Sequence, residues 1–479
     1  MCDGFIQRFI DPQRSVPGFM TVIGFEILLY SKLQDIFELK HREVYQDMTQ
    51  PINHYYIASS HNTYLVHDQL IGESSVEGYI NALKKGARCV EIDIWDGADN
   101  APVVYHGHTL TSRILLSDVL DVIRDYAFVA SAYPLVLSLE IHCSLPQQIV
   151  IAQLMKTKLG DFLYNKKIET TEDLPSPDQL QKLIFLKAKK LKEDSDECES
   201  GEEFEEEENS VTEMNGTVTN DEKDTPVKNN SHMHRQTSQT KKTPMKVAQE
   251  LSDLVNFFQA KSFKSFEDCK NWNPCEMYSL SESKAENLST TSYSQFIEST
   301  SRRICRIYPR GTRTDSSNYS PIPFWNVGCQ MVALNYQTAG IPMMINDALF
   351  SENGNCGYVL KPAFLRNINA QLKEKKMILK LKIISGQRIP KPGLASEGEV
   401  VDPYVVIRVD GHPKDEQKVK TKFILNNGFN PVWNEEFELI VRVPELAIVS
   451  FLVYDQNPLG KNEILGYFAL PFSAIAEGW

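Results

Sequence analysis

The sequence lacks the patterns that mark secreted and membrane-spanning proteins. Its nine cysteines are an odd number, scattered from Cys2 to Cys356 without CxxC pairs or metal-type spacing, which is typical of free thiols in a reducing compartment. The longest apolar stretch near the start, residues 19–30, is interrupted by Glu26 and is far too short to span a bilayer. No basic segment with a small-residue cleavage site precedes it. We therefore expect a cytoplasmic protein that reaches membranes only transiently.

An excess of positive charge is also missing. The chain carries 50 Lys and Arg against 63 Asp and Glu, a formal net charge of −13. Such a charge repels nucleic acid on average, so any anionic partner must be met by local basic patches. We expect no nucleic-acid partner. The 479 residues are too many for one core and predict about three domains.

One segment has too few apolar residues to fold. Eleven of the sixteen residues 193–208 are Asp or Glu, and the polar composition continues to about residue 245. Such a segment cannot bury enough apolar surface to offset its ordering entropy, so residues 193–245 are predicted to be an acidic disordered linker. The linker divides the ordered chain in two.

Around the linker, short β-rich runs alternate with stretches of helical periodicity. This alternation predicts an α/β fold with a parallel sheet covered by helices. A closed (β/α)8 barrel fits better than an open sheet, because chemically interesting side chains recur at the ends of successive strands, where barrel enzymes carry their sites. The expected strands are residues 55–59, 89–94, 103–105, 135–141, 183–186, 306–308 and 331–336.

The C-terminal part has a different period. From about residue 377 apolar and polar residues alternate, with turn signals at Asn427-Gly428 and Asn430-Pro431, which predicts an antiparallel β-sandwich. Its expected strands are residues 379–384, 404–409, 436–443 and 448–454. Residues 1–45 are expected to be helical and contain no DxDxDG calcium loop.

Two histidines and two acids stand at strand ends. His61 and His106 each follow a short apolar run, and Glu91 and Asp93 lie between them. Two proton-handling groups and two acidic oxygen ligands indicate calcium-assisted attack on a phosphate ester. Taken singly, a histidine after a strand is usually a surface residue, and a Glu-x-Asp pair usually lines a solvated strand face.

Several motifs resemble eukaryotic phosphoinositide-specific phospholipase C. The chain contains, in order, SSHNTYL (59–65), EIDIWDG (91–97), YHG (105–107), SLE (138–140), RIYP (306–309), DSSN (315–318), GYVLKP (357–362) and NGFNP (427–431). These motifs span nearly the whole chain except the linker. Their number and order favour the functional interpretation of the histidines and acids.

The resemblance implies a domain organisation. In that family the segments before and after the linker, called X and Y, form a distorted TIM barrel, and a C2 sandwich follows. The expected parts are 1–45, a short helical EF-hand-like remnant; 46–192, the X half; 193–245, the linker; 246–368, the Y half; and 375–479, an incomplete C2 domain. No pleckstrin-homology domain is expected in it. The arrangement is similar to the delta and zeta types, as a short isoform or an incomplete sequence.

The resemblance also implies an activity. It is the hydrolysis of phosphatidylinositol 4,5-bisphosphate to diacylglycerol and inositol 1,4,5-trisphosphate through a cyclic phosphate, with Ca²⁺ as cofactor. His61 is expected to donate to the phosphoryl oxygens and His106 to protonate the leaving oxygen. Either Glu140 or Glu91 is the expected base. The expected calcium ligands are Asn62, Glu91, Asp93 and Glu140.

Further residues match the family's lipid contacts. The expected head-group contacts are Lys187, Lys189, Ser279, Arg306 and Tyr308, and the expected C2 calcium ligands are Asp402, Asp455 and Asn457. The solvated-surface interpretation of Lys189 and Ser279 stays equally open. The partners implied are the bisphosphate lipid and, through the C2 domain, anionic phospholipid at the inner membrane face; we expect a monomer.

Two alternatives stay open. The chain could instead be a catalytically silent phosphoinositide-binding scaffold, of the kind that this family also contains and that typically lacks a catalytic histidine. The acidic linker could inhibit the barrel until an anionic membrane repels it, or could be a plain tether.

Overall fold

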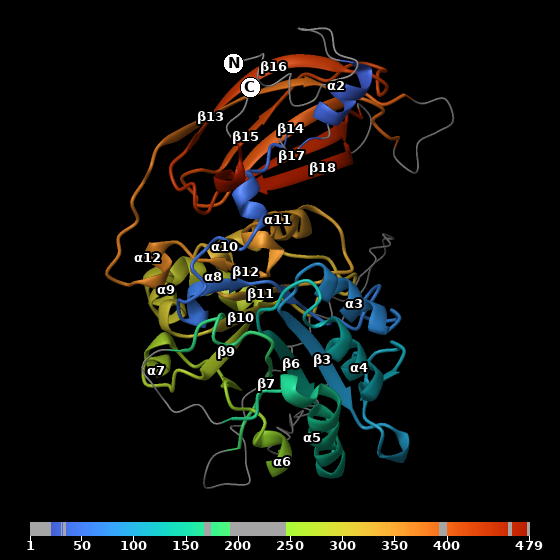
Figure 1. The fold of residues 1–479 in the computed structure, drawn as a ribbon, viewed down its shortest axis with the longest axis vertical. Coiled ribbons are helices and arrows are strands. Elements are labelled where there is room, and N and C mark those ends of the chain that lie inside the picture. Colours follow the sequence, from blue (N-terminus) through green and yellow to red (C-terminus); the bar gives the residue numbers. More distant parts are fainter. Residues whose placement is uncertain are drawn as a thin grey trace, which may run out of the picture.

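The structure is a computed structural model with a helix-covered barrel and a β-sandwich (Figure 1). The expected linker lies outside the described residues, as does most of the expected EF-hand remnant. Within the described part, no helix is long and apolar enough to cross a membrane. The structure describes residues 21–29, 31, 35–166, 174–191, 246–391, 400–457 and 462–476.

Eight parallel strands close into a barrel. Each pairs with the next in parallel, β11 pairs with β2, and β2 pairs with β3, which completes the ring. The expected barrel, split between two halves of the chain, is therefore confirmed. Its strands are β2 (Ser59–Ser60), β3 (Cys89–Trp95), β6 (Leu135–Ile141), β7 (Ile184–Ala188), β8 (Phe258–Ala260), β9 (Glu276–Ser281), β10 (Cys305–Tyr308) and β11 (Met331–Leu334).

Helices cover the outside of the barrel because their apolar residues fall on one face. In α4, Leu116, Val119, Leu120 and Ile123 follow the 3–4 spacing of a helix and are buried. The longer helices are α3 (Val76–Lys84), α4 (Leu116–Tyr126), α5 (Leu145–Leu159), α8 (Glu282–Thr291), α9 (Tyr293–Arg302) and α11 (Ile341–Phe350). Shorter ones are α2 (Val22–Leu29), α6 (Gln249–Ser252), α7 (Phe266–Cys269), α10 (Ile322–Trp325) and α12 (Ala363–Arg366).

In and beside the barrel, the observed strands differ from the expected ones in three places, and in the sandwich two further strands, residues 417–420 and 463–471, had not been expected. β1 (Tyr55–Ile57) leaves the barrel and pairs antiparallel with β12 (Tyr358–Leu360). β4 (Val103–Val104) lies outside the parallel ring, where it pairs antiparallel with the end of β3 and antiparallel with β5 (Ile114–Leu115). The barrel strands β8 and β9 have no counterpart among the expected ones, because β8 has only three residues and β9 carries serines on its inner face.

The C-terminal part is an antiparallel sandwich, as expected. β13 (Met377–Ser385) pairs with β16 (Val432–Val441) in one sheet. The second sheet has the order β15 (Gln417–Lys420), β14 (Pro403–Asp410), β17 (Ile448–Asp455) and β18 (Glu463–Pro471). Alternate residues such as Val405, Ile407 and Val449 meet between the sheets and form the core.

The sandwich packs on the barrel through α11, which contacts β17 and β18 (Figure 1). Ile341 of α11 contacts the apolar cluster of Tyr404, Val406 and Leu452 on the sandwich. Asn326 adds a hydrogen bond from its Nδ2 to the carbonyl of Gly411 at 2.8 Å.

The two-residue period of the strands creates layers inside the barrel. Near the N-terminal strand ends the inward residues are apolar, among them Cys89, Val136 and Met331. Two residues further along, Glu91 stands opposite Ser138, and Ser138 stands opposite Lys187. An apolar floor therefore supports a polar layer, and this layer faces the mouth formed by the C-terminal strand ends.

Candidate active site at the barrel mouth

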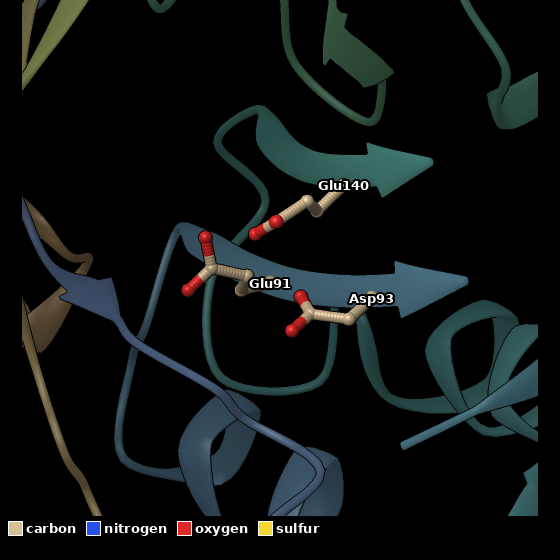
Figure 2. A group of neighbouring side chains, drawn as sticks. All are labelled: Glu91, Asp93 and Glu140. Carbon is tan, nitrogen blue, oxygen red and sulfur yellow. The ribbon is translucent and has the colours of Figure 1, made fainter. Parts of the chain in front are cut away.

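Three carboxylates gather at the barrel mouth. Glu91 and Asp93 project from β3, and Glu140 projects from the neighbouring strand β6 (Figure 2). One oxygen of each lies within 4.8 Å of the others. Hard oxygen donors without a thiol or imidazole among them suit Ca²⁺ or Mg²⁺ rather than zinc. The structure thus brings together three of the four residues expected to hold calcium.

Asn62, the fourth expected ligand, follows directly after β2. Its backbone has φ +38°, the left-handed region, and its amide N–H donates to Glu91 Oε2 at 3.0 Å. Asparagine adopts this region more readily than most residues. The turn therefore places the Asn62 backbone N–H against the Glu91 carboxylate.

Glu91 is a buried carboxylate held in its charged form. Arg306 reaches across the barrel from β10, and its Nη2 lies 2.8 Å from Glu91 Oε1. Burial alone raises the pKa of Glu91, but Arg306, His61 and the Asn62 amide outweigh it and lower this pKa to about 2. The ion pair joins a strand of the first half to a strand of the second.

His61 is held in one orientation by an amide. Its Nδ1 lies 2.9 Å from Asn335 Oδ1, and an amide oxygen only accepts, so Nδ1 carries the proton. Its Nε2 lies 4.0 Å from Glu91 Oε2. Burial lowers the pKa of His61, an effect that the Glu91 charge opposes.

His106 is oriented by the backbone. Its Nδ1 lies 2.7 Å from the carbonyl oxygen of Gln69, so Nδ1 is again the protonated nitrogen and Nε2 carries the lone pair in the neutral ring. The His106 amide donates to Thr111 Oγ1 at 3.2 Å. Both histidines expected from the sequence therefore present Nε2 as the reactive nitrogen.

Glu140 is tied to an aromatic stack. Its Oε1 lies 3.0 Å from His142 Nε2, and the His142 ring stacks on Trp95 at 4.0 Å between centroids and 9° between planes. The backbone after His106 packs against the same indole, since a Cβ at Gly107 would lie 1.8 Å from Trp95 Cζ2. The stack thus connects the end of β6 to the segment that carries His106.

The third carboxylate is bound by a tyrosine. Tyr64 donates its hydroxyl to Asp93 Oδ2. Burial and the nearby Asp93 charge raise the pKa of Tyr64 well above its usual value. Tyr64 therefore stays protonated and keeps the Asp93 carboxylate in place.

The expected head-group residues lie on neighbouring strands. Lys187 is on β7, Ser279 on β9, and Arg306 and Tyr308 on β10, with Arg306 opposite Ser279. Lys189 follows β7 directly. The Ser279 hydroxyl has no hydrogen-bond partner within the described residues. These five residues therefore surround one side of the polar layer, with Arg306 also paired to Glu91.

In the sandwich, two of the three expected calcium ligands meet. Asp455 Oδ1 accepts from the Asp402 amide at 2.7 Å, which brings the two aspartates together beside the end of β17. Asn457 donates its amide to Asn462 Oδ1 at 2.9 Å. Within the described residues, no group of three metal-binding side chains forms in the sandwich.

Several residues that shape the mouth were not expected from the sequence. Asn335 orients His61 and directly follows β11, so a polar residue after a strand was the available signal. Tyr64 and His142 lie within two or three residues of expected site residues, and this proximity was the available signal. Ser316 lies in the DSSN motif, but its contact with Gln69 joins positions 247 residues apart, which local sequence does not reveal.

Family models match most of the chain. The model "Phosphatidylinositol-specific phospholipase C, X domain" matches residues 48–190, and the Y-domain model matches residues 251–364. A C2-domain model matches residues 377–479. The X and Y matches cover the two halves of the barrel.

Curated relatives align over almost the whole chain. The Xenopus laevis 1-phosphatidylinositol 4,5-bisphosphate phosphodiesterase delta-4 is 43% identical over 476 residues, which cover 96% of this chain and 61% of the relative. Human inactive phospholipase C-like protein 2 is 42% identical over 96% of this chain and 41% of its own length. The chain spans about three fifths of the length of the delta relatives that it matches.

A solved structure shares the architecture. The crystal structure of S. officinalis PLC21 superposes with a TM-score of 0.78 at 32% identity, covering 99% of this chain and 58% of that one. Because two matched models describe the two halves of one closed barrel, and relatives align across both halves and the sandwich, the chain belongs to the phosphatidylinositol-specific phospholipase C family and is similar to its delta members.

Proposed function

We propose that this protein is a calcium-dependent phospholipase C that cleaves phosphatidylinositol 4,5-bisphosphate into diacylglycerol and inositol 1,4,5-trisphosphate. The supporting observation is the barrel mouth, where two histidines with defined protonated nitrogens flank three carboxylates within 4.8 Å of one another. The proposed substrate is the one that the delta relatives are named for, as 1-phosphatidylinositol 4,5-bisphosphate phosphodiesterases.

The donor set fits calcium. Asn62, Glu91, Asp93 and Glu140 offer amide and carboxylate oxygens, which a flexible calcium shell accepts. A calcium ion held there supplies positive charge that stabilises the phosphoryl oxygens and lowers the pKa of the attacking inositol hydroxyl. Without a cation, three carboxylates this close repel one another.

The histidines handle protons on the phosphate. Asn335 holds the Nδ1 proton of His61, so His61 donates to the phosphoryl oxygens from Nε2 in its imidazolium form, in which both nitrogens carry a proton. His106 protonates the departing diacylglycerol oxygen and then, as a base, activates water on the cyclic phosphate. Its ring orientation is set by the Gln69 carbonyl.

Glu140 is the better candidate for the base that accepts the inositol 2-hydroxyl proton. Both oxygens of Glu91 are engaged, one by Arg306 and the other by the Asn62 amide. Glu140 binds His142 through one oxygen, and its side chain is 40% exposed at the mouth. An accessible carboxylate can reach a substrate hydroxyl, whereas Glu91 is confined to the interior.

The head group is bound by the residues beside the carboxylates. Lys187, Lys189 and Arg306 supply positive charge for the 4- and 5-phosphates, Ser279 a hydroxyl, and Tyr308 a ring against the inositol face. Loss of one cation weakens bisphosphate preference by about 1 to 3 kcal/mol, the scale of a charge-assisted hydrogen bond.

The membrane is the site of action. The C2 domain and the phospholipase domains imply phospholipid binding. We infer that Asp402, Asp455 and Asn457 support calcium-dependent docking on anionic phospholipid, and that a monomer from the cytoplasm docks transiently on the inner membrane face.

A phosphoinositide-binding scaffold is the second candidate. An inactive human relative shares 42% identity with this chain, so overall similarity does not separate the two functions. The presence of both histidines in the mouth favours the enzyme.

Release of inositol trisphosphate from vesicles containing the bisphosphate lipid, across a calcium titration, tests the proposal. We expect calcium-dependent release that falls about 10²- to 10⁴-fold in His61→Ala, the range for a lost proton-transfer group. A folded protein that binds these vesicles without releasing product would establish the scaffold instead.

A further inference from the structure

The side chain of Asn62 is held by Gln69, a residue of which the proposed chemistry uses only the backbone carbonyl. Asn62 Nδ2 donates to Gln69 Oε1 at 2.8 Å, and both residues are buried. An amide group has one oxygen end and one nitrogen end. While Nδ2 is bound to Gln69, Oδ1 is turned away from Gln69.

Gln69 is in turn held by a serine from the other half of the barrel. Its Nε2 donates to Ser316 Oγ at 2.8 Å, and Ser316 Oγ donates to the carbonyl of His67 at 2.8 Å. Gln337 Nε2 also approaches Ser316 Oγ, at 3.2 Å. Ser316 lies in the DSSN motif, and its side chain is buried beneath the mouth.

A backbone carbonyl sets the direction of every bond in this row. The His67 carbonyl only accepts, so the single Ser316 hydroxyl proton points to it, and Ser316 Oγ accepts from Gln69. Gln69 therefore shows its nitrogen to Ser316 and its oxygen to Asn62. The orientation of the Asn62 amide follows from these donor and acceptor roles.

We propose that Gln69 is a positioning residue, which orients Asn62 so that Oδ1, and not Nδ2, is offered to a cation at the carboxylate cluster. We name the row Ser316, Gln69 and Asn62 the amide relay. The proposal rests on the proposed function in one respect, that Asn62 is a calcium ligand. An amide nitrogen is not a ligand for calcium, so a reversed Asn62 would remove one donor.

The competing interpretation is that Gln69 only pins its own segment. The backbone N–H of Gln69 also donates to the Thr314 carbonyl at 2.9 Å, and the backbone carbonyl of Gln69 accepts from His106. A pinning role and an orienting role predict the same loss for a single variant. The two roles predict different losses when residue 62 is an aspartate, because its carboxylate has two equivalent oxygens and needs no orienting partner.

A double-mutant cycle separates the two roles. Calcium binding is measured by calorimetry on the full chain without lipid, and the heat remaining in Asp93→Ala/Glu140→Ala is subtracted as binding elsewhere. In wild type, Gln69→Met is expected to weaken calcium binding about 10-fold, as outer partners of metal ligands typically do. In an Asn62→Asp background, the same change is expected to alter affinity less than about 2-fold or to improve it.

The reason for the difference is symmetry. A carboxylate at position 62 presents oxygen in either orientation, so Gln69 has nothing left to orient, and its Oε1 faces a like charge. An equal loss in both backgrounds would overturn the relay and establish pinning. Unchanged affinity after Gln69→Met in wild type would overturn it as well.

Two further variants guard against misfolding. Ser316→Ala removes the acceptor that sets the direction of Gln69, so affinity is expected to fall about 3- to 10-fold in wild type and to stay unchanged in Asn62→Asp. Gln330→Met is the matched control, since this buried glutamine donates to the carbonyls of Asn53 and Thr300 at 2.8 and 2.7 Å, at the opposite barrel end. It is expected to destabilise the fold without changing calcium affinity.

The lipid assay distinguishes failure of the relay from failure of the proposed function. An intact cycle without product release overturns the enzyme and supports the relay. Normal product release with equal losses in both backgrounds overturns the relay alone. No calcium binding at the carboxylates overturns both.

Discussion

The two ends of the barrel use buried charge in opposite ways. At the floor, Arg88 Nη1 donates to the carbonyls of Ala127 and Ser131 at 2.7 and 3.3 Å. Lys361 Nζ donates to the carbonyls of Thr300 and Gly328 at 3.0 and 3.1 Å. At the mouth, charged side chains face one another instead, as Glu91 and Arg306 do.

The difference shows which end of the barrel serves stability. The floor cations satisfy backbone oxygens at helix ends and strand starts, so they hold the chain together without leaving a charge for a ligand. The mouth places three carboxylates within 4.8 Å of one another, with Arg306 paired to one of them, and such local conflict is typical of functional sites. Substitutions at the mouth should therefore change turnover, and substitutions at the floor should change stability.

The largest effect is expected at the exposed carboxylate. Glu140→Gln removes the proposed base and one calcium ligand, so turnover on vesicles at saturating calcium should fall about 10²- to 10⁴-fold. The melting temperature should change little, because the side chain is part exposed. Glu436→Gln, on the exposed face of the sandwich, is the control and should leave turnover unchanged. Turnover near wild type in Glu140→Gln would remove Glu140 from the proposed chemistry.

A smaller effect is expected where a histidine is oriented. Asn335→Leu leaves His61 Nδ1 without its acceptor, a loss worth about 1 to 3 kcal/mol for a buried group. Turnover should therefore fall about 10- to 100-fold, and Asn335→Asp should recover part of it because an acceptor returns. Equal turnover in Asn335→Leu and wild type would show that His61 needs no orientation.

At the floor the expected effect is on stability and depends on pH. Burial lowers the pKa of Lys361 to about 7 in the folded state, against 10.5 ordinarily. Between pH 7 and 10.5 the unfolded chain binds more protons at this lysine than the folded chain does. The cost of burying the charged lysine therefore lowers the free energy of unfolding fully below pH 7 and is relieved as the pH rises. From pH 7 to 9, the free energy of unfolding measured in urea should rise by about 1 to 2 kcal/mol more for wild type than for Lys361→Met. Parallel pH curves would contradict the lowered pKa of Lys361.

The smallest effect is expected away from both ends. On the sandwich, Lys382 Nζ lies 3.1 Å from Glu436 Oε1, and both side chains are exposed. Exposed pairs contribute about 0 to 1 kcal/mol. Lys382→Ala should therefore change the free energy of unfolding by no more than about 1 kcal/mol, and it should leave turnover unchanged. A turnover loss as large as that of a mouth variant would break the comparison between the regions.

Most of the barrel could be predicted from the sequence because its buried strands consist of short runs of apolar residues. β3, β6 and β7 lie where their β-rich runs predicted them. β8 was missed because it has only three residues, and β9 because the serines on its inner face resemble loop residues. β1 was assigned to the barrel because periodicity does not say which partner a strand chooses.

The same limit applies to the mouth. His61, Glu91, Asp93 and Glu140 stand at strand ends in an order that predicts a shared site, and the structure brings them together. Gln69 and Asn335 were missed because their importance comes from contacts with Ser316 and His61, which lie 247 and 274 positions away in the chain.

By itself, the sequence determined the parallel barrel split by an acidic segment, the antiparallel sandwich and the set of oxygen and imidazole groups. These properties depend on periodicity, composition and local order, which a linear chain records directly. Only the tertiary structure decided that Arg306 pairs with Glu91 across the barrel and that the His67 carbonyl sets the orientation of Asn62 through Ser316 and Gln69. Closure of the barrel brings these distant residues within hydrogen-bonding distance, and a hydrogen bond acquires its direction only from the partner that it meets.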